Sequence, residues 1–556
     1  MSLNNDDKEY AGPQTTVSPA YEGLTDEELA TTHEGDHGTR RDLPPRVVSM
    51  IAIAGTIGTG LFLGSGSALA LGGPVGAWLG YTIMGALVGC MMYCLGEMTC
   101  FAPNIGGFVE MGTKYVSPHF GFMMGINYIL QTGMAIPSEL SAIAVMLSFW
   151  DENATHAGIY IAVFLVVAIG VNVIGVRYYG EIEFWFACLK VATLVGLILF
   201  GLIANLGGIG PKHEFIGGRY WRDEPFNDTF KGLQPVAKAR FLGFWAVFTK
   251  AAFSYGGIES IGILAGEAHN PRRTMRMAVR TVFYRIIGIY MLAILIIGLN
   301  VSQKSPELLS AVAGGGKTAA SSPFVVICKQ TGVQVLPSII NAVVMTSALS
   351  SANENIYAVS RTLMALARNG SMPQWFLKTN KAGIPFSGVI IGFCFALLAF
   401  LSLSAGSNVA FSWLSNLSAL SSLVGWTCIC YCYTRFKKAC DVQGIDRTRL
   451  PLRSWFQPYL AWVCILFFSL VLIFNGFTVF LGEFAISDFF AAYVTLPLIL
   501  MCFIGFKLVR KTKGVHTDDI DLGGGPAEAL RGTQYDRLEY AAPVGHQLSS
   551  SAGEKV

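Results

Sequence analysis

The sequence is poor in charged residues, and this scarcity excludes most soluble folds. Only 13% of its 556 residues are Asp, Glu, Lys or Arg, whereas 53% are hydrophobic. Soluble domains usually carry about 25% charged residues. The 39 basic and 36 acidic residues nearly cancel, and no basic block favours a nucleic acid partner. The composition therefore predicts a polytopic membrane protein surrounded by lipid.

Histidines and groups of residues typical of catalytic or metal sites are also scarce. The eight histidines fall mostly in loops or tails, and no Ser/His/Asp, metal or phosphate constellation stands at membrane depth. Most of the twelve cysteines lie in apolar runs, and the spacing of Cys428, Cys430 and Cys432 scatters them around a helix. Such cysteines are typical of small packing residues rather than of disulfides or zinc sites. We therefore expect no enzyme activity, no metal and no cofactor.

A cleavable signal sequence is a further absence. Residues 1–45 are polar and do not open with a basic and then an apolar stretch, so the first membrane segment would start translocation without being removed. Residues 1–45 and 511–556 are expected to be disordered cytoplasmic tails. Ubiquitin-ligase or trafficking partners would bind there.

Long apolar runs make up the rest of the chain. A bilayer core of about 30 Å needs roughly 20 apolar residues for each helix. Twelve such segments lie at 47–69, 76–100, 120–148, 158–176, 183–205, 241–265, 281–301, 335–362, 386–404, 409–433, 458–480 and 487–509. The sequence therefore predicts an all-α polytopic membrane protein with twelve transmembrane helices over residues 46–510.

Basic residues in short loops indicate which face of the membrane is cytoplasmic. Arg46 precedes the first segment, Arg272 follows the sixth, Arg435 follows the tenth and Lys511 follows the twelfth. All four fall on one face, so both termini are predicted to be cytoplasmic. The loop at residues 206–240 is an exception, because it is also basic although the number of crossings places it outside. We keep the prediction because the other loops agree with it and because this loop also contains acidic residues.

Glycines and hydroxyl groups interrupt two of the segments in their middle. The first contains AIAGTIGTGLFLGSG and the sixth contains AAFSYGGIESIGILAGE. Peptide groups in hydrocarbon must be hydrogen-bonded, so an unwound stretch is tolerated only where it lines a polar cavity. Close helix packing through small residues is the alternative interpretation.

The two interruptions occupy corresponding positions in two five-helix halves, at about 46–205 and 241–434. A half with an odd number of helices is followed by one of opposite orientation, which is the pattern of transporters built from inverted repeats. The sequence thus predicts a 5+5 inverted repeat with broken helices 1 and 6. Helices 11 and 12, at about 458–509, follow the repeat.

A broken helix exposes peptide N–H groups at one end and carbonyl groups at the other. The N–H end favours a carboxylate and the carbonyl end an ammonium group. A zwitterionic α-amino acid would satisfy both ends, and so would a related zwitterion or cation. A sugar would instead need side-chain amides and aromatic platforms. The pattern favours a secondary transporter of amino acids.

Six motifs in matching order carry a resemblance to a known family: GTIGTGLFLGSG, GEM, IPSELSA, FSYGGIES, AGEAHNPRRT and YAVSRTLMALARNG. With them, the chain from about Arg40 to about Arg510 resembles the fungal amino acid permeases of the amino acid–polyamine–organocation superfamily. The resemblance implies the five-plus-five fold. It also implies proton-coupled uptake, or symport, of L-amino acids across the plasma membrane by alternating access.

The resemblance also implies a set of substrate-binding residues in the two interrupted segments. They are Gly58, Thr59, Gly60, Phe253, Ser254, Gly256, Glu259 and Ser260. The first three match the backbone that receives the substrate carboxylate, and Phe253 to Gly256 match the stretch that faces the amino group. Phe253 also matches an aromatic residue that closes over the ligand, while Glu259 and Ser260 match a G-x-E-S arrangement.

Two stretches depart from the family pattern. Gly257-Ile258-Glu259 stands where G-T-E is common, and SSANEN stands in the eighth segment where S-A-G-N-S is common. The second departure introduces Glu354, a specificity candidate. If Glu354 faces the cavity, it would favour cationic amino acids. If it faces a partner helix, it would have no effect on specificity.

Ionisable residues inside membrane segments are costly and are candidates for function. Glu139 follows Pro137 in the third segment, and is either a proton or substrate site or a packing acid bonded to a hydroxyl group. Lys190 lies deep in the fifth segment. The resemblance places Lys190 against the broken first helix. There its ammonium group would either exchange a proton during transport or only stabilise the interrupted backbone. Both residues are proton-coupling candidates.

A non-transporting amino acid sensor of the same fold is the main rival function. Such sensors tend to have long cytoplasmic extensions, and the tails at 1–45 and 511–556 are short. A permease for a related amine or zwitterion is a second rival. A channel is disfavoured because the chain has no repeated selectivity-filter sequence.

Overall fold

The computed structural model describes residues 57–102, 107–151, 153–174, 176–210, 213–264, 271–312, 322–380, 383–445, 447, 452–481, 484–520 and 522. All of them belong to one compact unit, Arg41–Val556. The expected N-terminal tail and residues 47–56 of the first predicted segment lie outside the described residues, as do residues 523–556 of the expected C-terminal tail.

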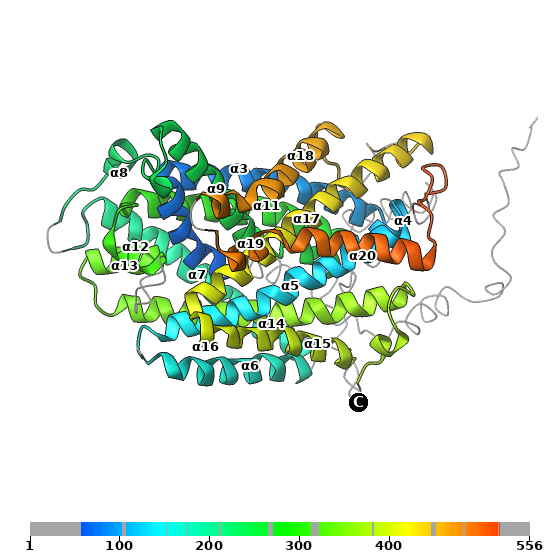
Figure 1. Ribbon diagram of the computed structural model, residues 1–556, viewed down its shortest axis with the longest axis horizontal. Coiled ribbons are helices and arrows are strands. Elements are labelled where there is room, and N and C mark those ends of the chain that lie inside the picture. Colours follow the sequence, from blue (N-terminus) through cyan, green and yellow to red (C-terminus); the bar gives the residue numbers. More distant parts are fainter. Residues whose placement is uncertain are drawn as a thin grey trace, which may run out of the picture. The chain divides into compact units, whose positions relative to one another are not determined.

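The secondary structure of the described residues is helical throughout, without strands (Figure 1). The α-helices are α3 (Ser65–Phe101), α4 (Phe108–Tyr115), α5 (Pro118–Leu147), α6 (Ala157–Ile174), α7 (Val176–Asn205), α8 (Arg219–Asp223), α9 (Val236–Tyr255), α10 (Ile261–Leu264), α11 (Pro271–Asn300), α12 (Pro306–Val312), α13 (Pro323–Gln330), α14 (Leu336–Arg368), α15 (Phe386–Ala396), α16 (Ser402–Ala405), α17 (Ser407–Val442), α18 (Tyr459–Phe474), α19 (Ile486–Tyr493) and α20 (Thr495–Arg510). Shorter 3-10 and π segments are η1 (Gly60–Gly64), η2 (Ala154–His156), η3 (Phe230–Gly232), η4 (Ile258–Ser260), η6 (Gln374–Leu377), η7 (Leu397–Leu401) and η9 (Asn475–Phe480).

Six helical runs in the described residues are long and apolar enough to cross a membrane, or up to seven if the bent pair α19–α20 is one span. The six runs are Gly60–Phe101, Pro118–Leu147, Gly180–Asn205, Phe386–Ser404, Ser407–Val442 and Tyr459–Phe480. The bent pair turns by 46° between its two helices. Helices α6, α9, α11 and α14 also match predicted segments in position. These findings establish an all-helical membrane protein with several crossings.

Helix α3 joins the first two predicted segments, where a loop at residues 70–75 was expected. The helical run bends at Gly73, whose φ of 75° and ψ of 174° are far from helical values. The amide of Val75, freed by this kink, donates to the carbonyl of Pro225 at 3.0 Å. The connection is therefore a single kinked residue held by a neighbouring loop.

Helix α5 lies in the centre of the helices, between α14 and α17 (Figure 1). In the most apolar stretch of α5, 89% of the residues are buried, against 28% for α7 and 33% for α18. Since α7 and α18 are apolar and exposed, they are the helices suited to contact lipid. Polar residues of α5 and α14 are instead enclosed by protein.

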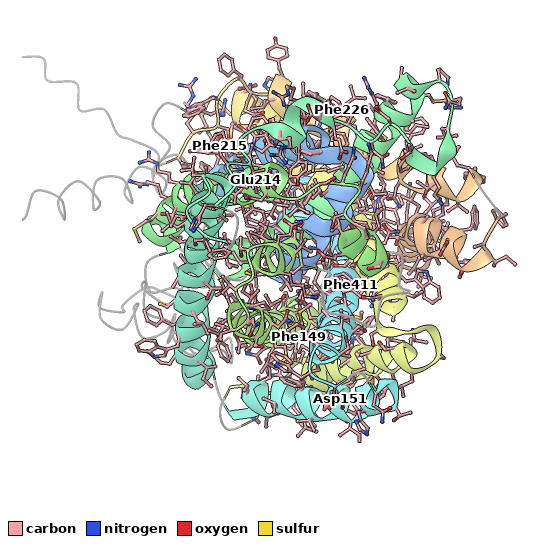
Figure 2. The ribbon with its side chains drawn as sticks, turned by 90° about the vertical axis from the view of Figure 1, so that its left-hand side faces the viewer. Phe149, Asp151, Glu214, Phe215, Phe226 and Phe411 are labelled. Carbon is pink, nitrogen blue, oxygen red and sulfur yellow. The ribbon has the colours of Figure 1, made fainter. Side chains whose placement is uncertain are left out.

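The basic loop between α7 and α9 balances much of its own charge. Arg219 pairs with Glu214 at 2.6 Å, and Arg240 pairs with Asp228. The Arg240 guanidinium lowers the pKa of the Asp228 carboxyl group by hydrogen bonding to it. Figure 2 looks onto the end of the helices where Glu214 lies. These ion pairs offset part of the positive charge that residues 206–240 carry.

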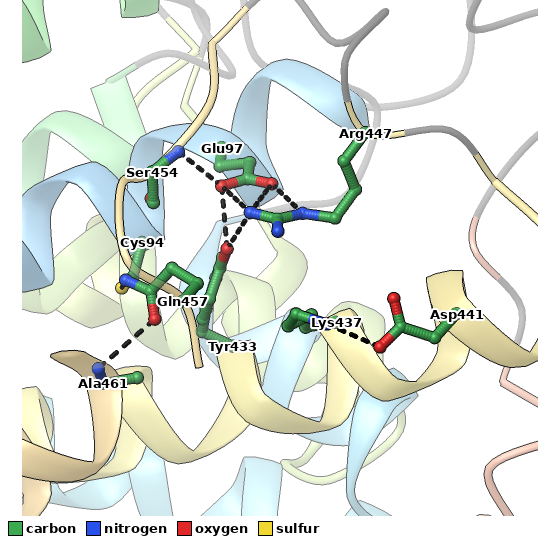
Figure 3. Close-up of polar contacts among 9 residues, drawn as sticks. All are labelled: Cys94, Glu97, Tyr433, Lys437, Asp441, Arg447, Ser454, Gln457 and Ala461. Carbon is green, nitrogen blue, oxygen red and sulfur yellow. Dashed lines mark hydrogen bonds and ion pairs between the residues drawn. The ribbon is translucent and has the colours of Figure 1, made fainter. Parts of the chain in front are cut away.

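The opposite end of the helices carries a buried ionic cluster (Figure 3). Glu97, which is fully buried, accepts hydrogen bonds from Nε of Arg447 at 2.8 Å and from its Nη2 at 3.0 Å. The hydroxyl group of Tyr433 donates at 2.8 Å and the amide of Ser454 at 2.7 Å. The cluster joins α3, α17 and the segment before α18. Removing one partner of such a buried pair is strongly destabilising.

The chain after α20 packs against this same end. Residues 511–520 and 522 were expected to belong to a disordered tail, but Ile520 and Leu522 are buried. The amide of Val515 donates to the carbonyl of Val116 at 2.9 Å, and Arg435 of α17 donates to the Val515 carbonyl at 2.6 Å. The packed domain therefore extends beyond residue 510.

We expect Gly73→Ala to destabilise the fold more than a matched glycine substitution. A Cβ atom at residue 73 would lie 2.8 Å from Cα of Phe226, a backbone atom that cannot rotate away. Gly406 has a similar backbone, with φ 86° and ψ 144°, but open space around it. Gly406→Ala should cost about 1–3 kcal/mol for the torsions alone. Thermal unfolding of the purified variants measures the difference, and equal losses would contradict the contact with Phe226.

Candidate functional site

The sixth predicted segment is broken in its middle, as the glycine pair indicated. Helix α9 ends at Tyr255, and η4 and α10 continue the segment after a gap of two residues. Gly256 has φ −58° and ψ 146°, and Gly257 has φ 88° and ψ −10°. A positive φ of this kind is readily adopted by glycine and rarely by other residues. The sequence therefore breaks the helix where two glycines adjoin.

Peptide groups at this break find partners outside the helix. The carbonyl of Ser254 accepts a hydrogen bond from the hydroxyl group of Tyr290 on α11, at 3.0 Å. The carbonyl of Phe253 accepts from the amide of Gly256 at 3.1 Å. Buried peptide groups without partners would be costly. Tyr290 thus helps to stabilise the interruption.

The first predicted segment is irregular at its described start. Ile57 and Gly58 are not helical, helix begins at Thr59, and Gly60–Gly64 forms a π-helix. The carbonyl of Ile57 accepts from Oγ of Ser347 on α14, at 2.9 Å. Short π-helical turns occur frequently at functional sites. The part of the predicted break before Ile57 lies outside the described residues.

The two irregular segments touch each other at glycine. A Cβ atom on Gly60 would lie 2.7 Å from Cα of Ser254 and 3.1 Å from Cδ1 of Phe253. Only a residue without a side chain permits this approach. Oγ of Ser254 is also 2.8 Å from the hydroxyl group of Tyr81 on α3. The contact brings two stretches about 190 residues apart in sequence to one place.

A small cavity of about 40 Å³ opens beside this contact. It is lined by Gly58, Gly60, Tyr128, Gln131, Ala135, Glu139, Phe253, Ser254, Gly256, Gly257, Ser260, Ser351, Glu354, Asn355, Ala358 and Ser418. All the expected substrate-binding residues line it except Thr59 and Glu259. Small-molecule sites usually measure about 300–1,000 Å³. The surrounding helices must therefore separate before a ligand fits.

Two buried carboxyl groups face this cavity from different helices. Glu139 of α5 accepts from Oγ of Ser351 at 3.1 Å, and Glu354 of α14 accepts from Oγ of Ser260 at 3.2 Å. These bonds use one oxygen of each carboxyl group. The second oxygen of each is buried without a hydrogen-bond partner in the described part of the chain.

Buried polar atoms normally have hydrogen-bond partners, so unbonded oxygens beside a cavity call for an explanation. A ligand with donors, such as an ammonium group, would satisfy the second oxygens of Glu139 and Glu354. Glu354 therefore faces the cavity, which is the first of the two orientations considered from the sequence.

Glu259 holds the break in place rather than lining the cavity. One oxygen accepts from Nε1 of Trp426 on α17 at 2.9 Å, and the other accepts from the side-chain amide of Gln131 on α5. Gln131 itself lines the cavity. Glu259 thus connects the interrupted segment to two neighbouring helices and orients a cavity residue.

Lys190 lies away from the cavity and pairs with an acid on its own helix. Its Nζ atom is 3.7 Å from Oε1 of Glu183, and both side chains are fully buried. Oγ of Ser350 donates to Glu183, and the next residue, Ser351, donates to Glu139. Two adjacent serines of α14 therefore connect the Lys190 pair with an acid that lines the cavity.

Sequence reasoning missed several polar lining residues that helical spacing could have indicated. On α5, Tyr128, Gln131 and Ala135 precede Glu139 at intervals of three or four residues, which place all four on one helix face. A face search from Glu139 would have found them. Phe411 of α17 was also missed; its ring meets that of Phe253 edge to face at 5.9 Å (Figure 2 labels Phe411).

Comparisons with known proteins identify the family. The sequence profile of the family described as amino acid permease matches residues 47–517. The dicarboxylic amino acid permease of Saccharomyces cerevisiae is 38% identical over 512 residues, which cover 91% of this chain and 83% of that protein.

Two further relatives are named after other substrates. The proline-specific permease of Emericella nidulans is 36% identical over 497 residues, covering 89% of this chain and 90% of that protein. The lysine-specific permease of Saccharomyces cerevisiae is 37% identical over 500 residues, covering 89% of this chain and 80% of that protein. Identity is thus nearly equal for relatives named after an acidic, a neutral and a basic class of substrate.

We expect Glu259→Ala to lower the free energy of unfolding by about 2–5 kcal/mol, because it leaves the buried donors of Gln131 and Trp426 without an acceptor. Ser260→Ala, at the adjacent position, removes a single hydrogen bond and should cost about 1 kcal/mol. Thermal unfolding of both purified variants provides the measurement. A smaller loss for Glu259→Ala than for Ser260→Ala would refute the bracing role of Glu259.

Proposed function

This chain belongs to the amino acid permease family, and from that premise we propose that it is a proton-coupled symporter of L-amino acids. It would work by alternating access in the plasma membrane, with both termini in the cytoplasm. The observation that carries this proposal is the cavity between two interrupted helices, flanked by the carboxyl groups of Glu139 and Glu354. A transporter, rather than an enzyme, is what the family and its named members indicate.

The proposed architecture has twelve crossings, of which the first ten form the 5+5 inverted repeat. Support comes from the break at Gly256 and Gly257 and from the irregular start at Ile57 and Gly58, which stand at corresponding positions of the two halves. The tails beyond the packed domain would carry the ubiquitin-ligase or trafficking contacts.

In the proposed binding mode, the ammonium group of the substrate meets the unbonded oxygens of Glu139 and Glu354. The carboxylate meets peptide N–H groups of the first interrupted segment at Gly58, Thr59 and Gly60, near the start of a helix, where anions are favoured. Phe253 would close over the substrate together with Phe411, whose ring it already contacts. Ser254, Gly256 and Ser260 complete the cavity wall.

Proton coupling would involve Lys190, Glu183 and Glu139. The hydroxyl groups of Ser350 and Ser351 lie between the two acids and are bonded to them. Adjacent hydroxyl groups of one helix could pass a change of charge at Lys190 on to the cavity by reorienting. A buried ion pair of this kind is costly to break on one side only, so protonation would be linked to helix movement.

A non-transporting sensor and a permease for a related amine remain the rival functions. A sensor would bind an amino acid without accumulating it, whereas a symporter accumulates labelled substrate above its outside concentration. An amine permease would ignore the substrate carboxylate. Uptake of labelled amino acids into transport-deficient cells, with decarboxylated analogues as competitors, separates the three.

We expect Gly60→Ala to abolish amino acid uptake while Gly64→Ala retains it. A Cβ atom on Gly60 would force the two interrupted segments apart, because it meets the backbone of Ser254 at 2.7 Å. On Gly64 the nearest atoms, Oγ of Ser254 and the hydroxyl of Tyr81, lie at 3.7 and 3.9 Å, an ordinary contact. Uptake is normalised to the amount of protein in the membrane. Normal uptake by Gly60→Ala would exclude the close approach from the transport cycle.

We expect Lys190→Met to abolish uptake driven by external acidification. The loss alone is ambiguous, because the variant leaves Glu183 charged and buried without Lys190. The double variant Lys190→Met/Glu183→Gln removes both charges and should restore the amount of folded protein but not proton-driven accumulation. Full recovery of accumulation by the double variant would make the pair structural and remove it from coupling.

A further inference from the structure

A second and much larger cavity, of about 510 Å³, lies at the end of the helices where α9 and α17 begin. Its wall comes from α9, α17, η9 and α19, with one residue of α3 and two of η3. The polar lining residues include Lys250, Asn408, Trp413, Asn416, Asn475 and Asp488. A volume of this size is within the range of small-molecule sites. In the proposed topology this end faces the outside.

Lys250 is the unusual member of this wall. It is half-buried within α9, and no carboxylate or other acceptor pairs with its ammonium group in the described part of the chain. The one described acid in the wall, Asp488, instead accepts a hydrogen bond from Nε1 of Trp413 at 3.0 Å. A cation in a membrane segment is costly unless it is paired, and is a functional candidate by default.

Lys250 stands one helical turn before the interrupted part of α9. Its carbonyl accepts from Oγ of Ser254 at 3.1 Å, and Ser254 lines the small cavity. Phe411, which contacts Phe253 of the small cavity, is followed in α17 by Ser412 of the large one. The two cavities therefore lie close to each other along both α9 and α17.

We propose that the large cavity is an outer binding site for an acidic, dicarboxylic amino acid, with Lys250 pairing with its side-chain carboxylate. The proposal rests on the transport function above and names the substrate class. An anion supplies the partner that the ammonium group lacks, whereas a basic substrate would be repelled by it. Glu139 and Glu354 line the small cavity and not this one, so in this proposal they meet the ammonium group of the substrate while its side-chain carboxylate is selected at Lys250. The amides of Asn408, Asn416 and Asn475 surround the same space with polar groups suited to a zwitterionic backbone.

An anionic lipid headgroup is the other source of the same chemistry. A headgroup bound at Lys250 would support the protein irrespective of the substrate, so its loss would affect all substrates equally. An acidic amino acid bound there makes the effect of Lys250 depend on substrate charge. The comparison of one acidic with one neutral substrate therefore separates the two sources.

The first test needs no substitution. Glutamate and glutamine have nearly the same shape but differ in the charge of the side chain. In cells that accumulate a labelled neutral amino acid through this protein, we expect glutamate to compete at about tenfold lower concentration than glutamine. Glutamine competing as well as glutamate would overturn the outer-site proposal but leave amino acid transport intact. No uptake of any amino acid would instead overturn the transport function itself.

The second test compares Lys250→Gln with Lys238→Gln. Lys238 lies on the same helix, is exposed and is not part of the cavity wall, so it controls for the lost charge. We expect Lys250→Gln to raise KM for glutamate about tenfold or more, with neutral uptake unchanged, and Lys250→Arg to retain glutamate uptake. Equal losses for glutamate and a neutral substrate, or no loss for either, would overturn the proposal. If Lys250→Gln fails to reach the membrane, Lys250→Arg and the competition test still decide.

Discussion

The need to hydrogen-bond every peptide group inside a membrane is the constraint on which this structure depends. A continuous helix meets that need by itself, so an interruption persists only where other groups take over. At the second break Tyr290 bonds the carbonyl of Ser254, and at the described start of the first segment Ser347 bonds the carbonyl of Ile57. The break and the irregular start are thus each stabilised by a hydroxyl group from another helix. The small cavity lies beside these two stretches, where side chains replace the helical hydrogen-bond partners.

Buried carboxyl groups form the second level of organisation. Glu259 has both oxygens bonded to neighbouring helices, and Glu97 has several donors at the other end of the protein. Glu139 and Glu354 differ, because each keeps one buried oxygen without a partner beside the cavity. Glu259 and Glu97 hold helices together, whereas the unbonded oxygens of Glu139 and Glu354 lie beside a cavity and are available to a ligand. This difference separates supporting residues from candidate binding residues.

Many of the helices and the break in the sixth segment could be predicted from the sequence. Apolar length placed nearly every helix, and the glycine pair at Gly256 located the second break, since these are local properties of the chain. The connection expected at residues 70–75 is a kink at Gly73 rather than a longer loop, and the neighbouring loop holds it in place. Glu183 was missed because it stood at the start of an expected segment. Helix α7 begins earlier, at Val176, so Glu183 lies in the interior of the helix.

The sequence by itself determined a membrane protein, its family, the break in its sixth segment and the identity of several buried charges. All of these follow from composition, periodicity and motif, which need no knowledge of distant neighbours. Only the tertiary structure decided that Glu354 faces the cavity, that Glu259 braces it and that Lys190 meets Glu183. The physical reason is that a charge in low dielectric takes its role from its partner. For Glu354 and Glu259 those partners come from helices or turns that sequence order does not place side by side, whereas Glu183 precedes Lys190 on the same helix.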